Sequence, residues 1–444
     1  MALTLEDGSR VAVIGGGPAG SFFSYFLLDM LDRTGTEIEL DIYEPRDYSI
    51  PGPIGCNMCG GIISESLVQN LATEGINLPS NVVQRGIDSY VMHTDLGAVH
   101  LKTPLDEKRI AAVHRGSGPR TVKEVKWKSF DGYLQSLAVQ RGANIIKGRV
   151  DEVTRAEGKF AVKAKGGEAR TYDLIAVSVG VNTAALKLFE GLGTGYKAPA
   201  TTQTAIREYY LGEELIAQYL GSSMHVFLLD IPRLEFAAII PKGDYVTLAM
   251  LGQDIDGDLL KSFLTAPEVR ECFPPDWQWD QQACNCSPRM SLQAATHPYG
   301  DGILFLGDCG VTRLYKDGIG AAYRGAKAAA SAVVFHGASE EALRRHYWPA
   351  LVKMDRDNLI GRFIFLVTHL IQKSKLLRKG VVRMTASEQK PEVTWRPMSM
   401  VLWDMFTGSA PYRDILIRTL HPIFIIRLVL SVAVSILPGS PIRK

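Results

Sequence analysis

The hydrophobic pattern at the N-terminal end predicts a strand, a tight turn, a helix and a second strand. An apolar, β-branched run at residues 11–14 leads into three glycines, and residues 21–31 follow with apolar positions at helical spacing. Residues 38–43 are typical of another strand, which ends at Glu44. This order of elements is the opening of a dinucleotide-binding unit.

The same pattern returns near residue 302. A strand at residues 302–306 is followed by Gly307-Asp308 and by a helix of small residues at 321–334. The apolar residues 171–179 predict a buried parallel strand between the two occurrences. Other local patterns predict small strands near residues 87–101, an amphipathic helix at 130–141, and strands at 144–147, 150–154 and 160–165.

Residues 195–299 show a different pattern of apolar and polar positions. Alternating strands, such as 225–229, 236–240 and 245–250, are separated by turn residues, which favours an antiparallel sheet that forms one wall of a substrate pocket. We therefore predict an α/β fold with an inserted antiparallel substrate sheet and a C-terminal helical region. The predicted domains are a Rossmann-like domain (1–194 and 300–340, including the strands near 87–101), the substrate sheet (195–299) and the C-terminal helices (341–444).

The C-terminal region combines apolar helical segments with a cationic cluster. Residues 359–372 are strongly apolar, and a second apolar segment at 415–439 contains an uncharged run of about half a bilayer span. Apolar surface beside cations suits an anionic membrane face, so we expect these helices to lie at a membrane interface or to cover a lipid pocket. Core helices or a single membrane span are the alternatives. The predicted cluster is Lys373, Lys375, Arg378, Lys379 and Arg383.

Composition narrows the range of partners and compartments. The chain has 444 residues and a net charge of +2, which gives no general case for nucleic-acid binding. Its N-terminal segment is too polar and acidic for a secretion signal, and six cysteines without such a signal favour a reducing compartment. We expect a cytoplasmic, peripherally membrane-associated protein.

The first glycine turn provides the chemistry of phosphate binding. Gly15 allows a tight turn, Gly17 lets a pyrophosphate approach the backbone, and Gly20 lets the helix pack closely on the sheet. Ala19 lies in the same first turn of the helix, whose N-terminus offers unpaired N–H groups to phosphates. Glu44 stands where a carboxylate accepts both ribose hydroxyls. Considered by itself, this turn is compatible with NAD, NADP or FAD as the cofactor.

Separated motifs, in order along the chain, resemble the p-hydroxybenzoate hydroxylase type of flavoprotein, and within it the geranylgeranyl reductase family. The resemblance implies FAD as the cofactor, with Asp308 on its ribityl chain and the helix N-terminus Gly318–Gly320 directed at the flavin. The matching pieces are the glycine turn with Glu44, the cysteine before Gly60-Gly61, Arg115, residues 130–131, residues 240–244, and Gly307-Asp308 followed by Gly318, Ile319 and Gly320.

Two departures bear on the source of electrons. The Asp-Gly pair that hydroxylases usually carry is replaced by Ser-Val-Gly-Val-Asn-Thr at 178–183, which argues against an NADPH-dependent aromatic hydroxylase. The chain also lacks a second nicotinamide-type glycine motif. The reductant is therefore open: NAD(P)H, a ferredoxin or another carrier protein.

Four cysteines are the main candidates for chemistry beyond the flavin. Cys56 and Cys59 precede Gly60-Gly61, and Cys284 and Cys286 lie before the second flavin motif. They are interpreted as a thiol relay, as substrate-positioning thiols, as a four-cysteine metal or iron–sulfur site, or as small apolar loop residues. We favour Cys59 and Cys56 as catalytic thiols and no metal. Lys316 and Asp317 are either active at the pocket mouth or part of a solvated turn.

These features favour an oxidoreductase that reduces isoprenoid C=C bonds, as the resemblance implies. Hydride would pass from reduced flavin to one alkene carbon, and Cys59 or water would supply the proton. The alternatives are electron exchange with a quinone, a flavin monooxygenase or halogenase, and a membrane-docked subunit that passes electrons to a partner protein.

Overall fold

A computed structural model describes residues 3–56, 59–103, 107–120, 122, 125–279 and 282–436. A six-stranded sheet forms the first domain, in the order β19-β20-β12-β1-β2-β8. Its strands are parallel except β19, so both glycine-bearing turns lie at carboxyl ends of parallel strands. The strands are β1 (Arg10–Ile14), β2 (Glu39–Tyr43), β8 (Asn144–Ile146), β12 (Leu174–Val177), β19 (Tyr299–Gly300) and β20 (Ile303–Phe305).

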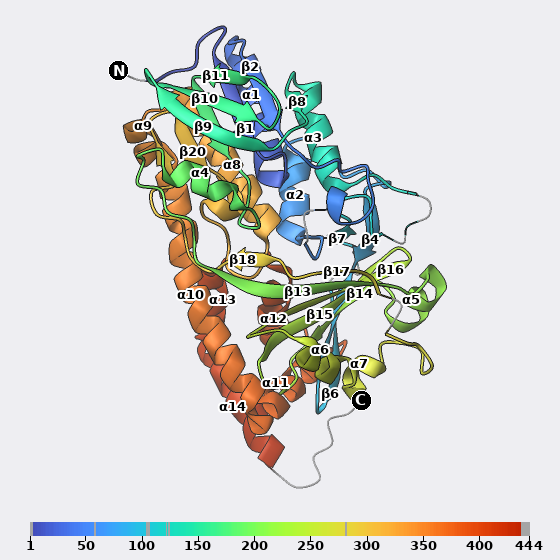
Figure 1. Ribbon diagram of the computed structural model, residues 1–444. Coiled ribbons are helices and arrows are strands. Elements are labelled where there is room, and N and C mark those ends of the chain that lie inside the picture. The colour runs from blue at the N-terminus through green and yellow to red at the C-terminus, as the bar shows by residue number, and fades with distance from the viewer. Residues whose placement is uncertain are drawn as a thin grey trace.

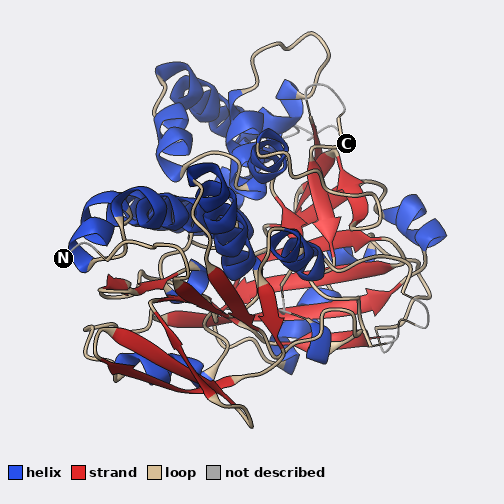
Figure 2. Ribbon diagram, turned by 90° about the horizontal axis from the view of Figure 1, so that it is seen from above, coloured by secondary structure: helices blue, strands red, loops and turns tan. Residues whose placement is uncertain are grey.

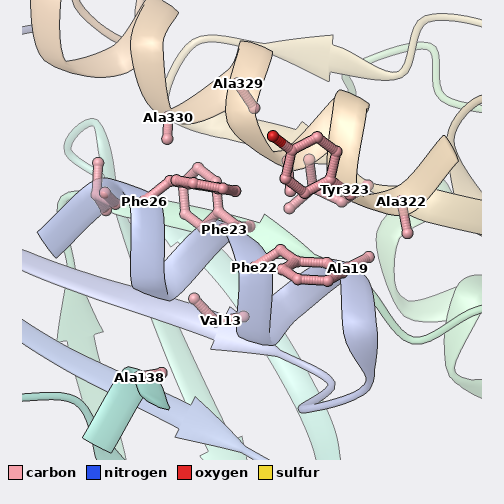
Figure 3. Packing of buried hydrophobic residues seen from close by; sticks show 14 of the residues in the cluster. Val13, Ala19, Phe22, Phe23, Phe26, Ala138, Ala322, Tyr323, Ala329 and Ala330 are labelled. Carbon is pink, nitrogen blue, oxygen red and sulfur yellow. The ribbon is translucent and has the colours of Figure 1, made fainter. Parts of the chain in front are cut away.

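Helices cover one face of this sheet and a small meander covers the other. Phe22 and Phe26 on α1 (Pro18–Thr34) pack edge-on against Tyr323 on α8 (Gly318–His336), with ring centroids 5.5 Å apart in both pairs (Figure 3). Each such aromatic pair contributes about 0.5–1.5 kcal/mol beyond its buried area. The other elements around this sheet are α3 (Phe130–Gln140), β9 (Val150–Ala156), β10 (Lys159–Ala164), β11 (Ala169–Tyr172), η2 (Ala184–Leu186) and α4 (Lys187–Glu190).

The predicted strand at 171–179 is divided in two at Asp173. The carboxylate of Asp173 accepts a 2.8 Å hydrogen bond from the backbone N–H of Arg10, and β11 leaves the parallel sheet to pair with β10. Only β12 therefore continues into the core of the domain, beside β1.

A second, eight-stranded sheet lies below the first in Figure 1. Seven strands run in the order β17-β13-β16-β15-β14-β5-β6, and β18 pairs with β13. In the view from above, most of the long helices lie to the upper left and most of the strands lie to the right and below (Figure 2). Its strands are β5 (Ser89–Thr94), β6 (Gly97–Lys102), β13 (Thr201–Tyr210), β14 (Ser223–Phe227), β15 (Leu234–Lys242), β16 (Tyr245–Gly252), β17 (Gln282–Cys286) and β18 (Arg289–Ser291).

The strands predicted near 87–101 belong to this substrate sheet and not to the first domain. Ser89 of β5 pairs with Ser223 of β14 in a parallel register, and β6 forms the edge of the sheet. Alternating polarity reveals a strand but not its partner, and this partner lies far away in the sequence. The substrate sheet is thus assembled from two separate chain segments.

A third sheet, in the order β3-β7-β4, connects the two domains. The side chains of Ala111 and Val113 on β7 enter the core of the first domain, whereas Ile110 and Ala112 enter the core of the second. The strands of this sheet are β3 (Ile62–Ile63), β4 (Val83–Ile87) and β7 (Ile110–Val113), and η1 (Pro53–Gly55) and α2 (Glu65–Thr73) flank β3 in the sequence. The short helix η3 (Gly307–Cys309) follows β20 at the second glycine turn.

Helices cover both faces of the substrate sheet. One face packs on α5, α6 and α7 through Phe263 and Phe273, and the other packs on the C-terminal helices through Met405 and Phe406. In Figure 1 the long helix α10 extends from the first domain down to α14. These helices are α5 (Glu213–Tyr219), α6 (Gly257–Leu264), α7 (Pro267–Arg270), α9 (Glu340–His346), α10 (Trp348–Lys373), α11 (Lys375–Glu388), α12 (Pro397–Thr407), α13 (Tyr412–Thr419) and α14 (Pro422–Ile436).

Among the described residues, no single helix is long and apolar enough to cross a membrane. One pair, α13 and α14, has the length and composition for a broken span, but the two helices meet at a bend of 66°.

Candidate functional site

A cavity of about 670 Å³ lies between the parallel sheet, the substrate sheet and the C-terminal helices. Both glycine turns open into it, as does the loop that contains Cys59. The part of the cavity wall at the two glycine turns therefore offers backbone N–H groups and carboxylates. The part formed by the substrate sheet and the C-terminal helices is apolar. Lining residues that carry the argument are Gly15, Gly17, Ala19, Glu44, Cys59, Gly60, Gly61, Arg115, Phe236, Ala238, Ile240, Gly307, Asp308, Lys316, Gly318, Ile319, Phe365 and Phe406.

The first turn has no room for side chains. Gly15 has a φ of 106°, and a Cβ there would stand 2.6 Å from the carbonyl oxygen of Ser178. A Cβ on Gly20 would stand 2.0 Å from the carbonyl oxygen of Gly15. These close approaches seat the N-terminus of α1, with Pro18 at its first position, at the cavity. The sequence-based roles of these glycines agree with this geometry.

Glu44 lies buried at the end of β2, beside the same turn. Its Oε2 accepts hydrogen bonds from the backbone N–H of Gly16 (2.8 Å) and the hydroxyl of Tyr48 (3.0 Å), and its Oε1 accepts one from the N–H of Arg46 (2.9 Å). A carboxylate has about four lone-pair sites, so acceptor capacity is left for a ribose hydroxyl. Glu44 both holds the turn and faces the cavity.

The second turn approaches the first closely. Gly307 has a φ of 64°, and a Cβ there would stand 2.9 Å from the Cβ of Ala19. Asp308 lines the cavity, and burial raises the pKa of its carboxyl group. A dinucleotide bound along both turns would give this half-buried carboxylate hydroxyl partners, which is the chemistry that a ribityl chain offers.

The N-terminus of α8 is organised by Asp317. This residue has a left-handed φ of 53°, and its Oδ1 accepts a 2.6 Å hydrogen bond from the hydroxyl of Ser64. Arg324 pairs with its other oxygen at 3.0 Å. A Cβ on Gly320 would stand only 2.2 Å from Asp317 Oδ1, which explains the glycine. Asp317, Gly318 and Ile319 all line the cavity, and the side chain of Asp317 is held there by its two partners and not solvated as in an exposed turn.

Arg115 lines the cavity but is already paired. Its guanidinium forms a two-bond ion pair with the buried carboxylate of Asp131, and the Nη2–Oδ2 distance is 2.8 Å. Burial lowers the pKa of Arg115, but Asp131 together with Cys59 and Tyr48 raises it by more, so the net shift of the pKa is upward. A cofactor would therefore meet a neutralised pair here.

The four candidate cysteines do not all meet at one point: Cys286 lies near Cys56 and Cys284, whereas Cys59 lies at the cavity. Cys59 lines the cavity, and its Sγ accepts a hydrogen bond from the N–H of Gly61 at 3.5 Å. The Sγ of Cys284 accepts a bond from the N–H of Arg120 at 3.3 Å, and burial raises the pKa of Cys286 to about 12, with Cys56 nearby. Among the described residues these thiols form no group of three ligands for a metal. Of the two favoured thiols, Cys59 is the one at the cavity.

Lys316 is more enclosed than a solvated turn would make it. Tyr315 adopts a left-handed φ of 59°, and the side chain of Lys316 turns inward, where its Nζ lies 3.7 Å from the ring centroid of Phe236. Burial lowers the pKa of this lysine to about 7. The sequence shows a lysine in the loop after Asp308. It does not show that the side chain points inward, because that direction depends on the backbone conformation at Tyr315.

Comparisons with known proteins agree with this geometry. No protein-family profile matches the chain. A chloroplastic geranylgeranyl diphosphate reductase from Oryza sativa subsp. japonica is 23% identical over 429 residues, which cover 87% of this chain and 80% of the relative.

Solved structures share the whole fold at low sequence identity. A flavoprotein/dehydrogenase from Cytophaga hutchinsonii has a TM-score of 0.61 at 12% identity and covers 97% of this chain and 99% of its own. The p-nitrophenol 4-monooxygenase of Pseudomonas putida also scores 0.61, at 14% identity, over 91% and 99%. HpxO of Klebsiella pneumoniae, solved with FAD, scores 0.56 at 14% identity over 94% and 99%. The predicted fold class is thereby confirmed.

Proposed function

We propose that this chain, an FAD-dependent oxidoreductase by its fold and its distant homology, reduces C=C bonds of an isoprenoid substrate at a membrane surface. One observation carries the proposal: a single cavity joins the two nucleotide-type turns to an apolar wall. The distant similarity to a geranylgeranyl diphosphate reductase supports the substrate class.

The residues at the two turns fit FAD. A Cβ on Gly15 or Gly20 would collide with backbone, and one on Gly307 would approach the Cβ of Ala19. Glu44 and Asp308 supply carboxylates for ribose and ribityl hydroxyls. The N-termini of α1 and α8 both face the cavity and favour negative charge. Bound and reduced FAD supplies a hydride to one carbon of the C=C bond.

The opposite wall is suited to a hydrocarbon chain. Phe236, Ala238 and Ile240 project from β15, and Phe365 and Phe406 project from α10 and α12. Apolar side chains exclude water and hold a polyprenyl chain through burial, at about 25 cal/mol per Å² of apolar surface. The same wall accommodates the tail of a quinone, which is the second candidate substrate.

Two residues at the cavity are candidates for the proton that completes the reduction. The thiol of Cys59 lies in the loop before Gly60-Gly61, and the ammonium group of Lys316 lies over Phe236. A general acid works best with a pKa near the working pH, which Lys316 satisfies at about 7. We therefore add Lys316 to Cys59 as a proton-donor candidate; Cys56 does not line the cavity.

The C-terminal helices support docking on a membrane. Phe365 of α10 faces the cavity, whereas Leu366 and Leu370 of the same helix are 57% and 56% exposed. Exposed apolar side chains also lie on α13, which packs on α10, and on α14, which packs on α11 and α13. Burial of such a side chain in lipid contributes about 1.5–3 kcal/mol. The exposed apolar side chains of α10, α13, α14 and the residue after α13 are Leu359, Phe363, Leu366, Val367, Leu370, Ile417, Leu420, Ile423, Ile425, Ile426, Val429, Leu430, Val434 and Ile436.

The predicted cationic cluster is only partly available to a membrane. Arg378 is buried and pairs with Asp95 at 2.8 Å, and Lys373 pairs with Asp230 at 2.8 Å. Lys375 is exposed, and Lys379 donates a hydrogen bond to the carbonyl of Ser435. Docking therefore depends on the apolar face more than on charge.

Anaerobic reoxidation of the reduced, FAD-loaded protein tests the proposal. We expect geranylgeranyl diphosphate or another polyprenyl compound to oxidise the flavin in the absence of oxygen. Oxidation by a quinone alone would assign the second candidate function, and oxidation by oxygen with a hydroxylated product would assign a monooxygenase.

A further inference from the structure

Three potential metal ligands meet in the substrate sheet, away from the cavity. His93 Nε2 lies 2.8 Å from His225 Nδ1, Cys272 Sγ lies 3.4 Å from the same Nδ1, and Sγ lies 3.8 Å from His93 Nε2. All three residues are buried. We call them the His-His-Cys cluster.

The fold brings these residues together from three separate segments. His93 and His225 lie on the neighbouring parallel strands β5 and β14, and Cys272 follows α7. Their face of the sheet is the one that packs on α6 and α7, with Phe227 and Phe263 as neighbours. The cavity lies on the opposite face, where Met224 and Ala238 are exposed to it.

The geometry is that of ligands around a common centre. Bonds of about 2.0–2.1 Å to nitrogen and 2.3 Å to sulfur at tetrahedral angles place ligand atoms about 3.3–3.6 Å apart. The two separations from Cys272 Sγ, 3.4 and 3.8 Å, are close to these values, whereas the 2.8 Å between the two nitrogens is a hydrogen-bond distance that would lengthen by about 0.5 Å when a metal binds. A hydrogen-bonded chain needs two contacts between three residues, whereas here all three ligand atoms approach one another.

Nδ1 of His225 is the shared contact of the cluster, since both His93 Nε2 and Cys272 Sγ lie within hydrogen-bond distance of it. A neutral imidazole binds a metal ion through the lone pair of one ring nitrogen. The thiol of Cys272 would release its proton to solvent when a metal binds.

We propose that His93, His225 and Cys272 bind one soft or borderline d10 cation, Zn²⁺ or Cu⁺, as a structural site. One thiolate and two imidazoles are ligands that both ions accept. Cu⁺ with a thiolate is neutral and suits three ligands, whereas Zn²⁺ leaves a charge of +1 and takes a fourth ligand such as water. The bound ion would fasten the segment after α7 to the two strands.

Metal content of the full-length protein, purified without a polyhistidine tag, tests this site. We expect about one equivalent of zinc or copper per chain by elemental mass spectrometry, and less than about 0.2 in Cys272→Ser and His225→Asn. Cys284→Ser and His100→Asn are matched controls that keep the metal. FAD content reports that each variant is folded.

Two further measurements keep the proposal testable if a variant fails to fold. Co²⁺ added to the metal-free native protein should give a thiolate-to-metal absorption band, and Zn²⁺ or anaerobic Cu⁺, added separately, should raise Tm and identify the preferred ion. The proposal is overturned if the native protein contains and binds none of these ions, or if Cys272→Ser keeps the metal. Either result would leave a hydrogen-bonded core cluster.

Discussion

The hydroxyl of Ser64 donates a 2.6 Å hydrogen bond to the carboxylate of Asp317 and so joins two loops that line the cavity. Ser64 caps α2, just after the Cys59-Gly60-Gly61 loop, and Asp317 precedes the N-terminus of α8. The cavity therefore depends on a contact between residues that are far apart in the chain.

Substitution of Asp317 should loosen this contact. Asp317→Asn keeps the side-chain size but removes the charge that faces Arg324, at an expected cost of about 2 kcal/mol in the free energy of unfolding. The loss of this contact would be seen as a smaller fraction of FAD retained during gel filtration and as a lower Tm. The exposed Asp276 gives a control, Asp276→Asn, that should leave both unchanged; equal behaviour of the two variants would contradict the anchoring role.

The close approach at Gly20 predicts a sharp effect of one added methyl group. Gly20→Ala places a Cβ 2.0 Å from the carbonyl oxygen of Gly15, so the phosphate turn must distort and FAD binding should be lost. Gly325→Ala in α8 meets only Leu351 at 3.9 Å and should bind FAD normally, with stability raised by up to about 1 kcal/mol. The flavin-to-protein absorbance ratio of the two variants measures the difference.

Lys316 should give the reaction a pH dependence. Only the ammonium form donates a proton, and its pKa is about 7, so the rate of substrate-dependent flavin oxidation should fall as pH rises through 7. Lys316→Met should lower this rate by about 10²–10⁴-fold and abolish the transition near pH 7. The exposed Lys353 supplies a control, Lys353→Met. An unchanged pH profile in Lys316→Met would transfer the role to Cys59 or water.

Acidic substitutions on the apolar helix face should prevent membrane docking. Leu366→Glu combined with Leu370→Glu replaces two exposed side chains of α10 and should lower vesicle binding more than tenfold, because each loses about 1.5–3 kcal/mol of burial in lipid. Flotation with anionic vesicles measures it. Phe335→Glu, at an exposed apolar position outside this face, is the control; flotation that survives the double substitution would argue against docking through α10.

Features that depend on a few consecutive residues could be predicted from the sequence. The turn after β1 follows from adjacent glycines and apolar runs, and its spacing to Glu44 is fixed by one helix and one strand. The placement of Asp308 followed in the same way from a second strand and turn. Local propensity and the final structure agree at these positions.

Features that depend on long-range packing could not be predicted from the sequence. Strands β5 and β6 show clear alternation, but their place beside β14 is set by a partner elsewhere in the chain. Helical periodicity in α10 did not distinguish burial from exposure, because the helix has both: Ile364 is buried and Leu366 is exposed. The inward turn of Lys316 depends on a left-handed residue before it, which no local pattern indicated.

Anaerobic turnover in D₂O tests the central claim most directly. The FAD-loaded protein, reduced with dithionite in D₂O and mixed with geranylgeranyl diphosphate, should yield a product with one C=C bond fewer and two non-exchangeable deuterium atoms, one on each carbon of the former double bond, because the N5–H of reduced flavin also exchanges with solvent. Oxidation of the flavin should match the bonds reduced. A flavin that stays reduced with polyprenyl compounds but is oxidised by a quinone or by oxygen would contradict the assignment.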